Sequence, residues 1–105
     1  MQMTDSLPIA CTLTPGELQD RGAEWRALTR YLDQTTLIPG GLSITFKKLD
    51  GVEPELQRLI ALEAECCAWM TFALLQGQGG LELTITADGE DGQRAARETF
   101  AYLIA

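Results

Sequence analysis

Apolar residues occupy every second position along several stretches of the chain, and this alternation predicts β-strands with one buried face. The pattern is clearest over 42–49 and 81–87, where the intervening residues are mostly serine, threonine, lysine or glutamate. A shorter alternation predicts another strand over 8–13. The stretch 34–41 ends in Pro-Gly-Gly and is expected to be a connector, because proline and glycine favour turns.

Three other segments carry apolar residues at spacings of three and four, which predicts amphipathic helices. The first is expected to begin at the capping box of residues 14–17 and to run to about residue 33. The second, and the most apolar, is expected over about 53–75, and the third over about 92–103. Glycines follow the second helix and are suited to end it.

These elements predict a single domain over 1–105, with a flexible N-terminus at 1–7. The expected fold is of the α+β class: a two-layer α/β sandwich in the order β-α-β-α-β-α. Its sheet is expected to have three strands of mixed direction. The polar face of the strands is rich in threonine, whereas a wholly parallel sheet normally has both faces covered. A mixed sheet or a second subunit would explain the polar face, and we expect a homodimer.

Charge and composition exclude several classes of partner. The net charge of −7 argues against binding to nucleic acid or to an anionic membrane surface. No apolar run approaches the roughly 20 residues that span a bilayer, and no signal peptide is expected. Three cysteines are an odd number, which favours reduced thiols in the cytoplasm. Histidine is absent, which removes the commonest metal ligand and general base.

The candidate chemistry lies in the second helix, where Glu63 precedes Cys66 and Cys67 by three and four residues on one face. Cys11 points inward in the first predicted strand, so all three thiols could meet at one patch. Thiolates with a carboxylate would suit a soft or borderline ion such as zinc, copper(I) or mercury(II). The alternative is that the cysteines are small core hydrophobes, as buried cysteines often are.

A carboxylate on a buried face needs a partner. Glu63 is expected to pair with Arg21 or Arg26 of the first helix, to act as a metal ligand or general acid/base in a pocket, or to be exposed by rotation of its helix. A reactive thiol needs a nearby cation, for which Arg21 is the best placed candidate. Because Cys66 and Cys67 are expected in mid-helix, a disulfide between them is set aside and a catalytic nucleophile is disfavoured.

Two tryptophans complete the candidate site. Trp25 and Trp69, with Arg21, could line a ligand pocket beside the metal ligands, although aromatic residues at helical spacing more often belong to a core. Trp69 and Phe72 fall partly off the buried stripe, and if exposed they would mark a contact with another subunit.

The chain resembles a family of small uncharacterised bacterial proteins. The resemblance lies in Ile9-Ala10-Cys11-Thr12-Leu13, in Glu24-Trp25-Arg26 and in Glu63-Ala64-Glu65-Cys66-Cys67-Ala68-Trp69, which match an "ACTL … E-C-C-x-F/W" pattern. It implies a shared fold but no settled activity. Related domains occur beside regulators of the mercury-resistance type, which implies a link to heavy metals.

The sequence therefore leaves three functions open. One is binding of a soft metal or metalloid ion by Cys11, Glu63, Cys66 and Cys67. Another is a non-catalytic interaction or regulatory dimer in which the cysteines only pack. The third, and the least favoured, is an enzyme that uses Glu63 and Arg21 in a pocket.

Overall fold

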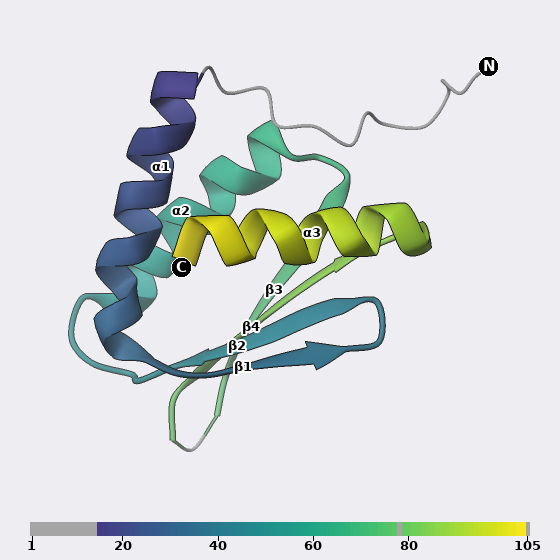
Figure 1. The fold of residues 1–105 in the computed structure, drawn as a ribbon. Helices are drawn as coiled ribbons and strands as arrows, with labels where there is room; N and C mark the ends of the chain where they lie inside the picture. The colour runs from purple at the N-terminus through teal and green to yellow at the C-terminus, as the bar shows by residue number, and fades with distance from the viewer. Residues whose placement is uncertain (1–14, 78, 105) are drawn as a thin grey trace.

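The structure is a computed structural model that describes residues 15–77 and 79–104. Within these residues, three helices and one short 3-10 helix accompany a four-stranded sheet (Figure 1). In chain order the elements are α1 (Pro15–Ala27), η2 (Leu28–Tyr31), β1 (Leu32–Ile38), β2 (Gly41–Phe46), α2 (Val52–Cys66), β3 (Met70–Gln76), β4 (Leu81–Ala87) and α3 (Gly89–Ile104).

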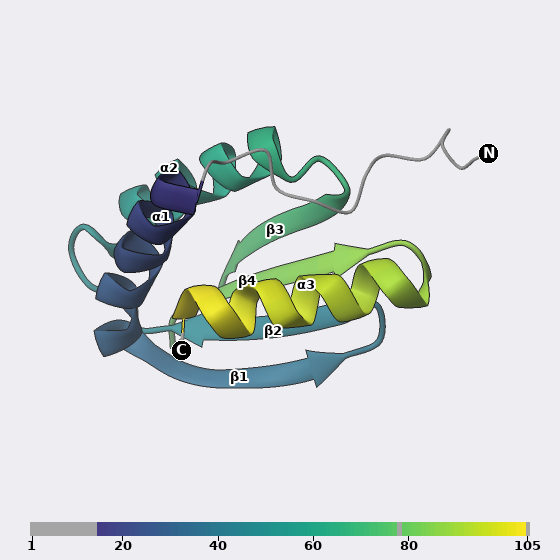
Figure 2. The same cartoon turned by 45° about the horizontal axis from the view of Figure 1, so that its top comes forward.

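The described strands lie in the order β1-β2-β4-β3, and each neighbouring pair is antiparallel. All three helices lie on one side of the sheet, and α3 lies over β2 and β4 (Figure 2). The protein is therefore a two-layer structure of the α+β class, as the alternation in the sequence predicted. The prediction of a three-stranded sheet of mixed direction was wrong for the described residues.

The segment 34–41, expected to be a connector, belongs instead to a β-hairpin formed by β1 and β2. Pro39 and Gly40 form its two-residue turn, and Gly40 has the positive φ of 87° that favours glycine. Five of the seven β1 residues are exposed, because α3 lies over β2 and β4 rather than over β1. A strand exposed on both faces has no apolar alternation, which is why the sequence pattern did not reveal it.

The second helix is shorter than expected. α2 ends at Cys66, and residues 70–76 form β3, which pairs with β4 along its whole length. Met70 and Leu74 are spaced for a helix, but Met70, Phe72 and Leu74 are also spaced for one face of a strand. Pairing with β4 decides between the two periodicities, because it satisfies the backbone hydrogen bonds of this segment.

The remaining differences concern the beginning of the chain. The strand expected over 8–13 lies outside the described residues. α1 ends at Ala27 rather than near residue 33, and the chain continues through η2 into β1. The described part consequently has the order α-β-β-α-β-β-α, which differs from the predicted alternation of single strands and helices.

The core lies between the sheet and the helices, and its centre fixes the position of α1. Trp25 is fully buried, and its ring meets that of Phe100 of α3 edge-on, with centroids 5.2 Å apart. Phe72 of β3 contacts the same phenylalanine ring, with centroids 6.0 Å apart. The alternating residues of β2 and β4 that were expected to point inward are buried: Leu42, Ile44, Phe46, Leu81, Leu83 and Ile85. Among the described residues, no helix is long and apolar enough to cross a membrane.

Candidate metal centre

The candidate site forms where α2 ends against α1. Glu63 and Cys66 lie in the last turn of α2, and Cys67 is the first residue after it. Their exposed fractions are 1%, 8% and 1%, so all three are buried. One carboxylate oxygen and the two sulfur atoms lie within 4.8 Å of one another. The described part of the chain therefore places three potential metal ligands in one buried cluster.

The distances within the cluster resemble those between ligands on one tetrahedral ion. The Sγ atoms of Cys66 and Cys67 are 3.5 Å apart, and Glu63 Oε1 lies 3.6 Å and 4.0 Å from them, respectively. Tetrahedral zinc would hold two sulfurs about 3.8 Å apart and a sulfur and an oxygen about 3.5 Å apart, given its usual bond lengths. A two-coordinate linear ion with similar bonds would need the sulfurs about 4.6 Å apart. The arrangement therefore favours a tetrahedral ion.

The end of α2 brings the two thiols together. Side chains of consecutive residues on a continuous helix point about 100° apart. Cys67 has φ −124° and ψ 65°, outside the helical region, although its N–H still donates to the Glu63 carbonyl oxygen at 2.7 Å. The expectation that both cysteines lie in mid-helix was wrong, since only Cys66 is helical.

The two oxygens of Glu63 have different partners. Oε2 accepts a hydrogen bond of 2.8 Å from the indole Nε1–H of Trp25 and one of 3.1 Å from Nη1 of Arg21. Oε1 faces the two thiols, and the Cys66 thiol donates to it. Of the two arginines considered as partners, Arg21 forms the ion pair with Glu63. One oxygen thus fixes the orientation of the carboxylate, while the other is directed at the sulfur atoms.

Arg21 supplies positive charge to an otherwise acidic site. Burial by itself would lower its pKa, but the hydrogen bond and charge of Glu63, together with the neighbouring Cys66, outweigh burial and raise its pKa above the usual value. Its side chain is only 11% exposed. The cation that thiol chemistry required from the tertiary structure is therefore present beside the cluster.

Formal charge also favours a particular ion. Two thiolates and a carboxylate carry three negative charges, while Arg21 and a divalent ion together carry three positive charges. A neutral cluster is easier to bury than a charged one, because an uncompensated charge is costly away from water. A monovalent ion such as copper(I) would leave one negative charge without compensation.

The other residues of the candidate site are distributed as follows. Cys11 lies outside the described residues, so its expected approach to the cluster stays a prediction. Trp25 is fully buried and bonded to Glu63. Trp69 lies half-buried in the turn between α2 and β3, where it packs against the core.

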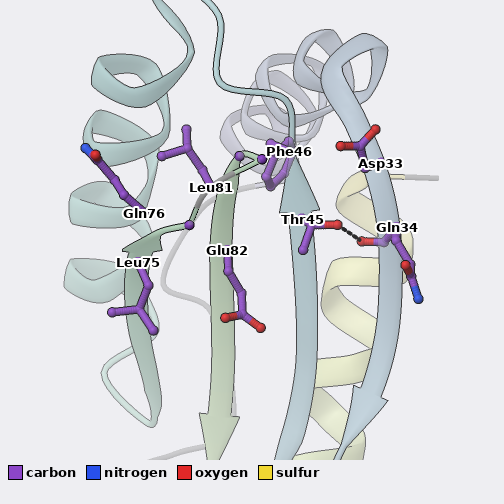
Figure 3. A pocket seen from close by; sticks show the side chains of 11 residues that line it. Asp33, Gln34, Thr45, Phe46, Leu75, Gln76, Leu81 and Glu82 are labelled. Atoms are coloured by element: carbon purple, nitrogen blue, oxygen red, sulfur yellow. Dashed lines mark hydrogen bonds between the residues drawn. The ribbon is translucent and has the colours of Figure 1, made fainter.

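A separate hollow of about 700 Å³ is lined by residues of the sheet and of the β3–β4 turn, and none of the described candidate ligands lines it. Figure 3 shows that its lining comes from all four strands, with Glu82 between Leu75 and Thr45. The Thr45 hydroxyl donates to the Gln34 carbonyl oxygen at 3.3 Å. Arg21, Trp25 and Trp69 do not line it. The buried cluster and this hollow are therefore different features.

Comparisons with protein-family models, with curated proteins and with solved structures found no match to this chain.

Proposed function

We propose that this protein binds a thiophilic divalent metal ion through Glu63, Cys66 and Cys67. The observation that carries the proposal is the convergence of one carboxylate oxygen and two sulfurs, all buried, within 4.8 Å. Zinc is a divalent ion with high affinity for thiolate whose usual tetrahedral geometry matches the site; mercury(II) shares the charge and the affinity, but its common linear binding of two thiolates would need the sulfurs to move apart. Both thiols lie close to Glu63 Oε1. On binding, the ion replaces the protons of these two thiols.

The fourth position of a tetrahedral ion is open to a further ligand. Cys11 is one candidate, because the sequence pattern directs it toward the same patch, although a third thiolate would leave one negative charge without compensation. An exchangeable ligand in its place would suit a protein that senses or sequesters an ion, since the ion must enter and leave. The family that the chain resembles is related to domains beside mercury-resistance-type regulators, and this relation supports a heavy-metal function. The proposal requires reduced thiols, and we therefore place the protein in the cytoplasm.

Native mass spectrometry of the reduced protein tests this function. The protein would be offered zinc, mercury(II) and copper(I) in turn, each with excess glutathione as a competing thiol. We expect retention of one divalent ion per chain and loss of that ion in the variant Cys66→Ser/Cys67→Ser. Cys11→Ser is the matched control: it should weaken retention without abolishing it. Full retention by the double variant would overturn the proposal, provided that circular dichroism shows both variants to be folded.

The second candidate function is that of an interaction or regulatory homodimer. The outer face of the sheet favours such a dimer. None of the described helices lies over this face (Figure 2), and Leu75 is 57% exposed on it. A second copy would cover such a surface. Sedimentation velocity over a range of concentrations tests this: Leu75→Ser should shift the protein toward monomer, and a monomer at all concentrations would contradict the dimer.

A further inference from the structure

The Sγ atoms of Cys66 and Cys67 approach to 3.5 Å at a point where the backbone has already left the helix. We propose that these two cysteines form a reversible disulfide with each other, so that the buried cluster is a redox site as well as an ion site. A disulfide needs the sulfurs about 2.05 Å apart, so they must approach by about 1.5 Å.

The end of α2 makes this approach possible. In a continuous helix, joining adjacent cysteines would break backbone hydrogen bonds on both sides of the pair. Here Cys67 has non-helical φ and ψ, and it makes two backbone hydrogen bonds that closure can affect: its N–H donates to the Glu63 carbonyl oxygen, and its carbonyl oxygen accepts from the Met70 N–H at 3.0 Å. Rotation of the Cys66–Cys67 peptide and of the two side chains can therefore close the bond while α2 keeps its preceding turns.

The geometry of neighbouring residues also makes such a bond easy to reverse. Adjacent Cα atoms are about 3.8 Å apart, below the range of about 4.4–6.8 Å usual for disulfides. A disulfide under this constraint is strained, and strained disulfides are reduced more readily than structural ones. The pair is consequently suited to switching rather than to permanent cross-linking.

Oxidised glutathione is the oxidant, and the exchange proceeds in two steps. The Cys66 thiol is the more accessible, at 8% exposed against 1% for Cys67, and it attacks first. Loss of its proton to water and attack on glutathione disulfide give a mixed disulfide and release one glutathione thiolate. Cys67 then loses its proton and attacks Cys66 Sγ, which releases the second glutathione. Two electrons pass from the cysteines to glutathione, and two protons complete the two glutathione thiols.

Oxidation would remove both sulfur ligands at once. The ion and the disulfide would then exclude each other, and an oxidising shift in the glutathione pool would release the ion. This coupling rests on the proposed function, whereas formation of the disulfide does not. The two can fail separately, because the disulfide is measured on metal-free protein.

Peptide mapping tests the disulfide. Metal-free protein would be equilibrated with glutathione buffers of increasing disulfide content, alkylated in acid and digested with trypsin without reduction. Cleavage after arginine places Cys66 and Cys67 together in the peptide 59–94 and Cys11 in the peptide 1–21. We expect peptide 59–94 to lose two hydrogen masses and to resist alkylation, while peptide 1–21 stays alkylated. Addition of reduced glutathione should reverse the change.

Two variants sharpen the test. Cys67→Ser should stop at a mixed disulfide on Cys66, and Cys11→Ser should still form the internal disulfide. A cross-link between peptides 1–21 and 59–94, or a wild-type protein that accumulates only glutathione adducts, would overturn the proposal. Unchanged thiols in a fully oxidising buffer would overturn it as well. These wild-type outcomes decide the matter even if a variant fails to fold.

Discussion

The indole N–H of Trp25 donates a hydrogen bond of 2.8 Å to Oε2 of Glu63, so a fully buried residue of α1 fixes a fully buried carboxylate of α2. The same oxygen pairs with Arg21, one turn earlier on α1. Together these contacts leave the second oxygen directed at Cys66 and Cys67. The packing of two helices thereby sets the orientation of a candidate metal ligand, and each contact can be tested separately.

Removing the indole N–H while keeping an aromatic ring should destabilise the protein. Trp25→Phe preserves much of the contact with Phe100 but takes one donor from a buried carboxylate. Hydrogen bonds to charged groups contribute about 1.5–3 kcal/mol, so the free energy of unfolding should fall by about that amount. Urea unfolding followed by circular dichroism measures it. An unchanged midpoint would show that the hydrogen bond contributes nothing.

Removing the Arg21 guanidinium should lower the free energy of unfolding more than removing an exposed guanidinium. Arg21→Met leaves the charge of Glu63 without its cation, and breaking a buried pair costs about 3–5 kcal/mol. We expect the low end of this range, because Arg21 retains some contact with water. The matched control is Arg58→Met, which removes surface ion pairs to Glu24 and Glu55 and should change the unfolding midpoint little.

A double-variant cycle separates the ion pair from packing. Glu63→Gln keeps an acceptor for the Trp25 indole but removes the charge. If the pair is the cause, Arg21→Met should be much less costly in the Glu63→Gln background than alone. If Arg21→Met lowers the free energy of unfolding equally in the wild-type and Glu63→Gln proteins, its effect is due to packing and not to the ion pair.

The surface pair of Glu55 and Arg58 should be visible in a pH titration. The hydrogen bond from Arg58 is the main cause that lowers the pKa of Glu55; slight burial opposes it and the Arg58 charge adds to it. Because the folded pKa is depressed, the stabilisation is present above the unfolded pKa and is lost as the pH falls through the folded one. NMR of the Glu55 carboxyl carbon should show a low pKa that rises toward its usual value in Arg58→Met. No rise would contradict the assignment.

Gly41 should tolerate no side chain at the junction of β2 and β4. A Cβ atom there would lie 1.8 Å from the Ile85 carbonyl oxygen, so Gly41→Ala must displace backbone. Gly16 in α1 has nothing within 4 Å of such an atom, and Gly16→Ala should be neutral or stabilise by up to about 1 kcal/mol. Thermal unfolding of both variants makes the comparison, and equal melting temperatures would contradict the close approach at Gly41.

Some of the structure could be predicted from the sequence because the relevant signals are local. The alternation in β2 and β4 reports a buried face, and the i, i+3 and i+4 spacing correctly placed Glu63 beside the two cysteines. The strands β1 and β3 were missed for two different reasons. β1 lies beyond the cover of α3 and has no apolar face, whereas the apolar residues of β3 are compatible with either period until β4 pairs with it.

The distances within the site could not be predicted from the sequence, because they depend on contacts between separate elements. The approach of the two sulfurs to 3.5 Å depends on where α2 ends, and no glycine or proline marks that point at Cys66. One of the three alternatives that the sequence left for Glu63 was a pair with Arg21 or Arg26 of the first helix. Only the crossing of α1 and α2 selects Arg21 and adds the indole of Trp25.

X-ray absorption at the zinc edge tests the central claim most directly. Reduced protein loaded with one zinc per chain should show at least two sulfurs at about 2.3 Å and an oxygen near 2.0 Å from the metal. Glu63→Gln should weaken the oxygen contribution and leave the sulfurs in place. A first shell made only of oxygen or nitrogen would contradict the account, because zinc would then be bound away from Cys66 and Cys67.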